Sequence, residues 1–138
     1  MKTAIVYWSG TGNTEEMAKC LAEGVTAKGG EAEIFHCSVF EPSKLVQYDS
    51  LALGCPSMGA EQLEESEFQP FYDSIKAHLK GKPVVLFGSY GWGSGEWMDT
   101  WEADCKEAGA DVKAAVICNL APDSEAADNL RKAGEALV

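Results

Sequence analysis

Short apolar runs alternate with longer amphipathic stretches along the whole chain. Five runs are rich in Val, Ile, Leu and Phe and are mostly unbroken by charge: residues 3–7, 32–36, 50–54, 83–88 and 111–118. Runs of this length and composition are typical of strands that are buried on both faces, as in a parallel sheet. The pattern therefore predicts five β-strands at these positions.

Between these runs, the apolar side chains recur with a helical period. In residues 14–28, Met17, Leu21 and Val25 recur every four residues, while charged side chains occupy other positions. Gly29-Gly30 then predicts the end of this helix. Similar patterns predict three further helices, at residues 68–79, 96–108 and 124–137.

Strands that alternate with helices predict an α/β fold with right-handed βαβ units and a doubly wound sheet. We expect a single domain over residues 1–138, because this length is that of one compact domain. Residues 38–48 fit either a short helix or a loop. Trp97 and Trp101 lie four residues apart on one predicted helix, and this spacing favours a role in the core.

Three loops that follow predicted strands are unusually rich in Gly, Ser and aromatic residues. They cover residues 8–14, 55–66 and 89–95. Ligands of doubly wound sheets bind beyond the carboxyl ends of the strands, where the strand order reverses. We therefore expect the three loops to meet at one edge of the sheet and form one binding site.

The first loop reads SGTGNT and has the composition of an anion site. Gly10 and Gly12 allow backbone conformations that other residues avoid, and a helix that starts near Asn13 points unpaired N–H groups at the loop. The side-chain donors are Ser9, Thr11, Asn13 and Thr14. The loop lacks both the Gly-Lys-Ser/Thr ending of a Walker A loop and the third glycine of a dinucleotide fingerprint. It therefore predicts a nest of neutral donors for one terminal phosphate, or else a tight turn with an ordinary N-cap.

The chain is acidic, with 22 Asp and Glu against 11 Lys and Arg and a formal net charge of −11. Nucleic acids and anionic membrane surfaces require clustered cations, so neither is an expected partner. The apolar run at residues 4–8 is too short for a signal peptide or a membrane span. An acidic surface favours solubility and would steer the protein toward basic partner proteins.

The five cysteines include no C-x-x-C pair and no pair at zinc-finger spacing, and the two histidines are isolated. We therefore expect no metal site. The cysteine usage favours a cytoplasmic protein. Four of the five cysteines lie in apolar or helical surroundings and are expected to be buried small residues.

Taken together, the three loops resemble those of the flavodoxins, which bind flavin mononucleotide (FMN). YWSGTGNTEEM (residues 7–17) is similar to the phosphate loop of the family, GCPSMGAE (54–61) to its second loop and GSYGWGSGEW (88–97) to its third. The resemblance covers the whole chain and indicates the short-chain branch, since the fifth strand lacks a long insertion. It implies the strand order 2-1-3-4-5 and a monomeric one-electron carrier with non-covalent FMN.

The resemblance also implies which residues hold the cofactor. These are Ser9, Gly10, Thr11, Gly12, Asn13, Thr14, Pro56, Ser57, Met58, Gly59, Ala60, Glu61, Ser89, Tyr90, Gly91 and Trp92. The first six would hold the phosphate. Met58 and Trp92 would enclose the flavin ring between them, and Glu61 would accept a hydrogen bond from the ring N3–H. Ser89 would lie near the ribityl chain or phosphate, with the backbone of Tyr90 and Gly91 near the pyrimidine end of the ring.

Gly59 would have a mechanistic role. In the family, the peptide after the corresponding glycine flips on one-electron reduction, and its carbonyl then accepts a hydrogen bond from flavin N5 and stabilises the neutral semiquinone. A side chain at this position would cost roughly 1 kcal/mol or more in a left-handed turn. Two residues depart from the pattern of relatives. Ala60 stands where some carry a better turn former, and Pro56 stands where a hydroxyl can reach the phosphate.

The second loop also predicts a low reduction potential. Residues 46–75 contain no Lys or Arg, and four glutamates fall within residues 61–67. One carboxylate ~10 Å from the flavin, at an effective dielectric of ~20, disfavours a further negative charge by about 1.7 kcal/mol. A difference of ~1.4 kcal/mol corresponds to about 60 mV for one electron. We therefore expect shuttling between semiquinone and hydroquinone, which would serve redox enzymes with basic surfaces.

Other proteins of similar architecture fit less well. A receiver domain needs clustered Asp residues after its first strand, and YWSG contains none; a small phosphatase needs Cys-x5-Arg, and no Cys lies six residues before Arg131. The remaining alternative is a small flavin-dependent reductase, of the quinone or nitro reductase type. Such an enzyme needs room for a substrate over the ring, and Met58 and Trp92 would leave little. We therefore expect an electron carrier that is not an enzyme.

Overall fold

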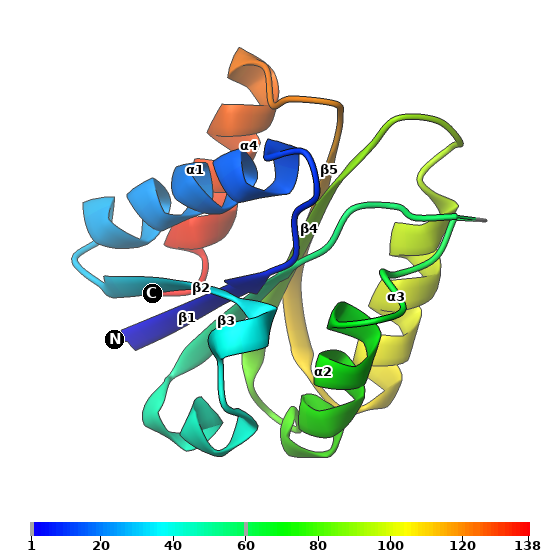
Figure 1. Cartoon of the computed structure of the whole chain (residues 1–138). Helices are drawn as coiled ribbons and strands as arrows, with labels where there is room; N and C mark the ends of the chain where they lie inside the picture. Colours follow the sequence, from blue (N-terminus) through cyan, green and yellow to red (C-terminus); the bar gives the residue numbers. More distant parts are fainter. Residues whose placement is uncertain (1, 60) are drawn as a thin grey trace.

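The computed structural model describes residues 2–59 and 61–138. Its centre is a sheet of five parallel strands in the order β2-β1-β3-β4-β5 (Figure 1). The strands are β1 (Lys2–Tyr7), β2 (Glu31–His36), β3 (Ser50–Gly54), β4 (Pro83–Tyr90) and β5 (Asp111–Asn119). This arrangement confirms the predicted fold class and strand order.

In the described part of the chain, four α-helices cover the sheet, two on each face. They are α1 (Asn13–Ala27), α2 (Phe68–Ile75), α3 (Glu96–Glu107) and α4 (Ser124–Glu135). Helices α1 and α4 lie on one face, and α2 and α3 lie on the other (Figure 1). Helix α1 ends where Gly29 takes a φ of +88°, as predicted. The predicted helix at 68–79 is α-helical only to Ile75 and continues as a 3-10 helix. Two further 3-10 helices, Cys37–Val39 and Pro42–Gln47, occupy the segment that fitted either a helix or a loop.

The side chains of the central strands alternate between two apolar clusters, one on each face of the sheet. On β1, Ile5 packs with α1 and α4, whereas Ala4 and Val6 pack with α2 and α3. Trp97 and Trp101 belong to the second cluster and are each only 2% exposed, which confirms the predicted core role. The fold is therefore stabilised by two hydrophobic layers that share one sheet.

Burial on both faces holds for only three of the five strands. Strands β1, β3 and β4 are buried almost throughout, whereas β2 and β5 are largely half-buried or exposed. The expectation of two-sided burial was therefore wrong for β2 and β5. Both lie at the edges of the sheet, where a strand has a neighbour on one side only.

The cysteines are free thiols, and four of the five are buried, as expected. Burial raises the pKa of Cys37 to about 12. Within residues 2–59 and 61–138, no three His, Cys, Asp or Glu side chains are grouped closely enough to hold a metal ion. In the same part of the chain, no helix has the length and apolar character needed to span a bilayer.

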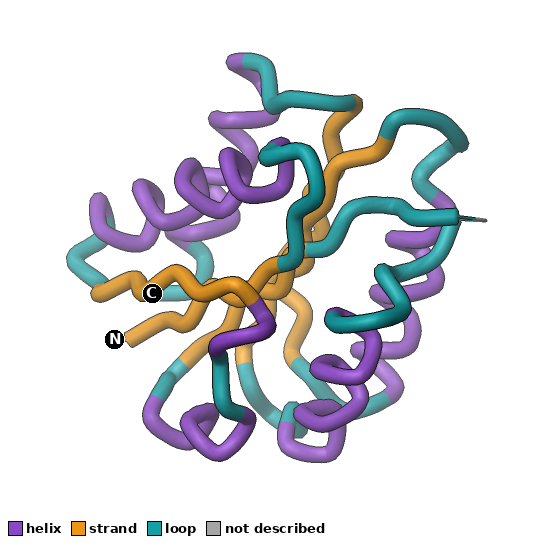
Figure 2. Tube along the Cα trace, in the orientation of Figure 1, coloured by secondary structure: helices purple, strands orange, loops and turns teal. Residues whose placement is uncertain are grey.

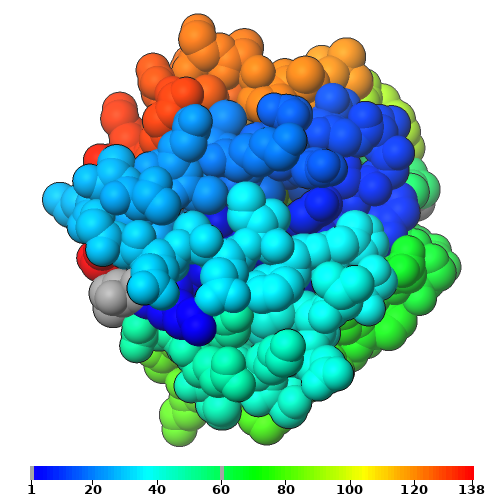
Figure 3. Space-filling view, turned by 60° about the vertical axis from the view of Figure 1, so that its left-hand side comes forward, coloured from blue at the N-terminus to red at the C-terminus, as the bar shows by residue number. Residues whose placement is uncertain are grey.

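Helices α1 and α4 pack against each other with direct backbone contact. A methyl group built on Gly24 would lie 1.9 Å from the carbonyl oxygen of Arg131, and one on Gly134 would lie 2.2 Å from that of Leu21. Figure 3 shows residues of both helices side by side on one face of the molecule. Glycine at these two positions therefore sets how closely the two helices approach.

The Gly24→Ala variant should be less stable than the wild type. Overpacking of this kind lowers the free energy of unfolding by about 1–3 kcal/mol, although alanine is favoured over glycine by ~1 kcal/mol inside a helix. Urea unfolding followed by circular dichroism measures the difference. A variant more stable than the wild type, as helix propensity alone would give, would contradict the backbone contact.

Candidate functional site

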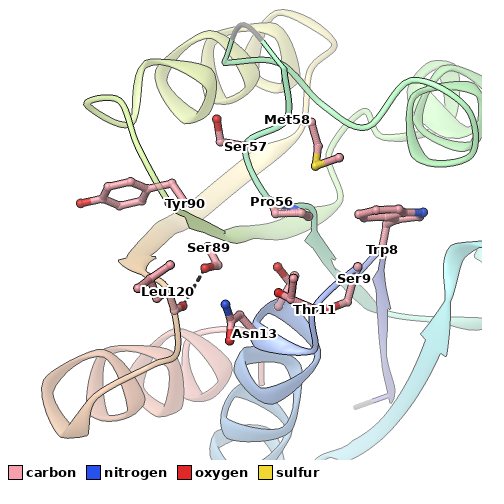
Figure 4. A pocket seen from close by; sticks show the side chains of 13 residues that line it. Trp8, Ser9, Thr11, Asn13, Pro56, Ser57, Met58, Ser89, Tyr90 and Leu120 are labelled. Atoms are coloured by element: carbon pink, nitrogen blue, oxygen red, sulfur yellow. Dashed lines mark hydrogen bonds between the residues drawn. The ribbon is translucent and has the colours of Figure 1, made fainter.

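The loops that follow β1, β3, β4 and β5 all leave the sheet at its carboxyl edge (Figure 2). They surround a cavity of about 260 Å³ (Figure 4). The residues that line it are Trp8, Ser9, Gly10, Thr11, Asn13, Thr14, Pro56, Ser57, Met58, Ser89, Tyr90, Gly91 and Leu120. Among these described residues, none carries a charge. The expectation that the three loops meet at one edge of the sheet is confirmed.

The first loop presents neutral hydrogen-bond donors at the start of α1. Gly12 is the N-cap residue with a φ of +95°, and no side chain of residues 2–59 or 61–138 caps the helix. The Gly12 amide instead donates to Ser9 Oγ at 3.0 Å. Thr14 is 1% exposed, and its hydroxyl has no hydrogen-bond partner among the described residues. A buried hydroxyl without a partner, beside uncapped helix amides, fits a terminal phosphate.

Gly10 has a different role from the one predicted. Its φ lies outside the left-handed region, so its backbone is one that other residues also adopt. A methyl group on Gly10 would instead lie 3.1 Å from the indole ring of Trp8. The expectation of a special backbone conformation was therefore wrong for Gly10 and right for Gly12. Gly10 leaves space for the Trp8 side chain.

The second loop begins as an extension of the sheet. The amides of Cys55 and Ser57 donate to carbonyls of β4 at 3.1 and 3.0 Å. Pro56 lies between them at the position whose amide is not needed for this pairing, so a residue without an N–H is tolerated there. This pairing brings Pro56, Ser57 and Met58 to the cavity.

Beyond Met58 the second loop turns back on itself. Met58 and Gln62 exchange two backbone hydrogen bonds of 2.8 and 2.9 Å. Gly59 and Glu61 both have a φ of +53°, in the left-handed region that favours glycine. Ala60 lies outside the described residues, and so does the prediction made for it.

Glu61 and Trp92 lie away from the cavity. The Glu61 carboxylate accepts a hydrogen bond from the Ser94 amide at 2.7 Å and fills the space beside Gly93. Trp92 is 65% exposed and borders a separate hollow together with Glu61. The structure therefore does not bring Met58 and Trp92 together, and their enclosure of a flavin ring stays a prediction.

Eleven of the predicted cofactor-binding residues line the cavity. They are Ser9, Gly10, Thr11, Asn13, Thr14, Pro56, Ser57, Met58, Ser89, Tyr90 and Gly91. Gly12, Gly59, Glu61 and Trp92 do not line it. Two lining residues were not predicted, Trp8 and Leu120. Trp8 directly precedes the first loop, and an aromatic residue at that position is a signal in the sequence.

Leu120 closes the cavity from the end of β5. It has a φ of +57°, and its amide donates to the Tyr90 carbonyl at 2.9 Å. The Ser89 hydroxyl donates to the Leu120 carbonyl at 2.6 Å (Figure 4). Nothing local in the sequence indicates this position, because a leucine rarely adopts a left-handed conformation.

Glu64 fixes the second loop to the start of α2. Its side chain is buried and accepts hydrogen bonds from the amides of Glu67 (2.7 Å), Phe68 (2.9 Å) and Ser66 (3.0 Å) and from the Ser66 hydroxyl. Burial opposes ionisation, but these hydrogen bonds outweigh it and lower the pKa of Glu64 to about 2. The carboxylate thus satisfies amides at the beginning of a helix, where a negative charge is also favoured by the helix dipole.

The lowered pKa of Glu64 predicts a loss of stability in acid. Because its folded pKa is about 2 and its ordinary value is 4.5, the contribution is complete above about pH 5 and is lost as the pH falls toward 2. The contribution is on the order of 3 kcal/mol. Urea unfolding between pH 7 and 2 should show a shallower pH dependence in Glu64→Gln than in the wild type. Glu65→Gln, which alters an exposed carboxylate nearby, is the control and should keep the wild-type dependence.

Comparison with known proteins identifies the family. The flavodoxin family model matches residues 5–134. The chain is 46% identical over 132 residues to a flavodoxin of Megasphaera elsdenii, covering 96% of this chain and 95% of that one. It is 51% identical over 98 residues to a flavodoxin of Clostridium beijerinckii, covering 71% of each. The solution structure of two-electron reduced Megasphaera elsdenii flavodoxin superposes with a TM-score of 0.92 at 45% identity, covering 98% of this chain and 97% of that one.

The fold and the site thus define an α/β protein with an uncharged cavity at the carboxyl edge of its parallel sheet. The chain belongs to the flavodoxin family. It is an FMN-binding electron carrier and not an enzyme.

Proposed function

We propose that this chain binds FMN in the cavity at the carboxyl edge of its sheet and carries single electrons at low potential. The observation that carries the proposal is the meeting of three loops around one uncharged cavity that contains a buried hydroxyl without a partner. Bound there, FMN supplies the one-electron chemistry. We further propose that residues 1–138 act as a single domain, as a monomer in the cytoplasm.

The residues of the first loop hold the phosphate in this proposal. Gly12 leaves the helix uncapped, and the hydroxyls of Ser9, Thr11 and Thr14 add donors around the same point. The start of α1 contributes a partial positive charge of roughly half an elementary charge. Neutral groups therefore bind the phosphate without cancelling its charge.

The uncancelled charge favours a low potential for full reduction. Carboxylates of the second loop add to it, since Glu61, Glu64 and Glu67 are fixed in place by hydrogen bonds. Each disfavours a further negative charge nearby by on the order of 1 kcal/mol. We propose that the protein operates between the one-electron and two-electron reduced states of FMN. The same acidic surface steers it to redox enzymes with basic surfaces.

The Thr14→Val variant tests the phosphate-binding role of the first loop independently of the contacts made by the rest of the cavity. Valine keeps the shape of threonine but cannot donate a hydrogen bond, so the affinity for FMN should fall about tenfold while the affinity for riboflavin, which lacks the phosphate, stays unchanged. Fluorescence titration with each flavin measures both. The protein without flavin should lose no stability, because the replaced hydroxyl has no partner among the described residues. An equal loss for both flavins would contradict the assignment.

Anaerobic reduction of the FMN-loaded protein tests the function. Stepwise photoreduction followed by absorbance should give two separate one-electron steps, with the second at the lower potential. A single two-electron step would count against the proposed carrier. Added NADH or NADPH alone should not reduce the flavin faster than it reduces free FMN, whereas rapid reduction by either would favour the reductase alternative.

A further inference from the structure

Trp8 forms part of the cavity wall. It is the first residue after β1, and its indole lies back over the first loop, in the space that Gly10 leaves open. In Figure 4 the indole and Met58 lie on one side of the cavity, and Tyr90 lies on the other. The wall beside Met58 is therefore flat and apolar.

The indole is fixed to the second loop by a hydrogen bond. Trp8 Nε1 donates to Glu67 Oε1 at 3.1 Å. The Glu67 amide in turn donates to the buried carboxylate of Glu64 at 2.7 Å. Glu67 is the N-cap residue of α2, but its side chain does not cap the helix. The Glu67 carboxylate is thus free of the usual capping role and holds the Trp8 side chain.

We propose that Trp8 is an apolar wall of the FMN site and that Glu67 is the residue that positions it. The inference rests on the proposed function. A flat aromatic face beside a thioether suits a planar aromatic ring. Because the indole N–H is directed to Glu67, the site gains an apolar surface there without leaving a polar group unpaired.

Substitutions of Trp8 test the wall. The dissociation constant of FMN, from quenching of flavin fluorescence, should rise tenfold or more in Trp8→Ala and threefold or less in Trp8→Phe, which keeps a flat ring. Riboflavin should lose affinity by the same factor as FMN, because the wall contacts the ring and not the phosphate. This pattern differs from the one expected for Thr14→Val.

Substitutions of Glu67 test the positioning role. Removing a carboxylate near an anionic ligand strengthens binding through the loss of charge repulsion. The positioning role has the opposite sign, so Glu67→Ala should weaken FMN binding threefold to tenfold. Glu67→Gln, whose amide oxygen still accepts a hydrogen bond, should recover most of the affinity. Glu65→Ala removes the same charge two residues away and should bind FMN as tightly as the wild type or more tightly.

The outcomes separate this inference from the proposed function. Wild-type protein that binds no FMN would overturn the proposed function. If the wild-type protein binds FMN, a folded Trp8→Ala variant of equal affinity would overturn the role of Trp8, and a folded Glu67→Ala variant of equal affinity would overturn the positioning role of Glu67. Circular dichroism and thermal unfolding establish that each variant is folded. If Trp8→Ala does not fold, the FMN affinity of Glu67→Ala is compared with that of Glu65→Ala. Weaker binding by Glu67→Ala alone supports the inference, and equal binding by the two variants contradicts it.

Discussion

All five strands run in the same direction, and this constraint determines where every functional part of the molecule lies. Parallel strands end at one edge of the sheet, and the helices that follow begin there. Loops beyond such an edge leave the regular ladder of the sheet, so each needs hydrogen bonds of its own to hold it in place. The first loop uses Ser9 and the start of α1, and the second uses amide pairing to β4 and the Glu64 carboxylate. The third loop is held by the hydrogen bond from the Ser94 amide to the Glu61 carboxylate. The cavity exists because three separately anchored loops meet.

The chemistry of the cavity follows from what these anchors leave free. Carboxylates beside the cavity are engaged with amides or with an indole, and the residues that line the cavity, among those described, are uncharged. An anion can therefore be held by hydroxyls, backbone amides and a helix dipole, with no cation to cancel its charge. A site built with a lysine would bind the same phosphate and make further reduction of the bound group easier. Neutral binding thus couples the phosphate loop to the electron-transfer property.

The strands and most helices could be predicted because they depend on the local periodicity of apolar residues. The meeting of the three loops at one edge of the sheet could be predicted because these loops follow strands and are rich in glycine. The exposed edges β2 and β5 could not, since which strand lies at an edge depends on strand order and not on composition. Gly10 shows a second limit, because a glycine needed for space looks the same in sequence as one needed for its φ. Leu120 shows a third, because its place at the cavity follows from how β5 ends against β4.

The glutamates of the second loop are alike in sequence but differ in physical role. Glu64 is buried and accepts hydrogen bonds from three amides and one hydroxyl, which fix its carboxylate at the start of α2 and keep it ionised to low pH. Among the described residues, the Glu67 carboxylate accepts a hydrogen bond from the Trp8 indole N–H, and the Glu61 carboxylate accepts one from the Ser94 amide. Neutral donors fix these three carboxylates without cancelling their charges, so each remains a negative charge at a defined place in the loop. The effect of an acidic loop on a bound flavin therefore depends on where each carboxylate is held, and only the folded chain determines those places.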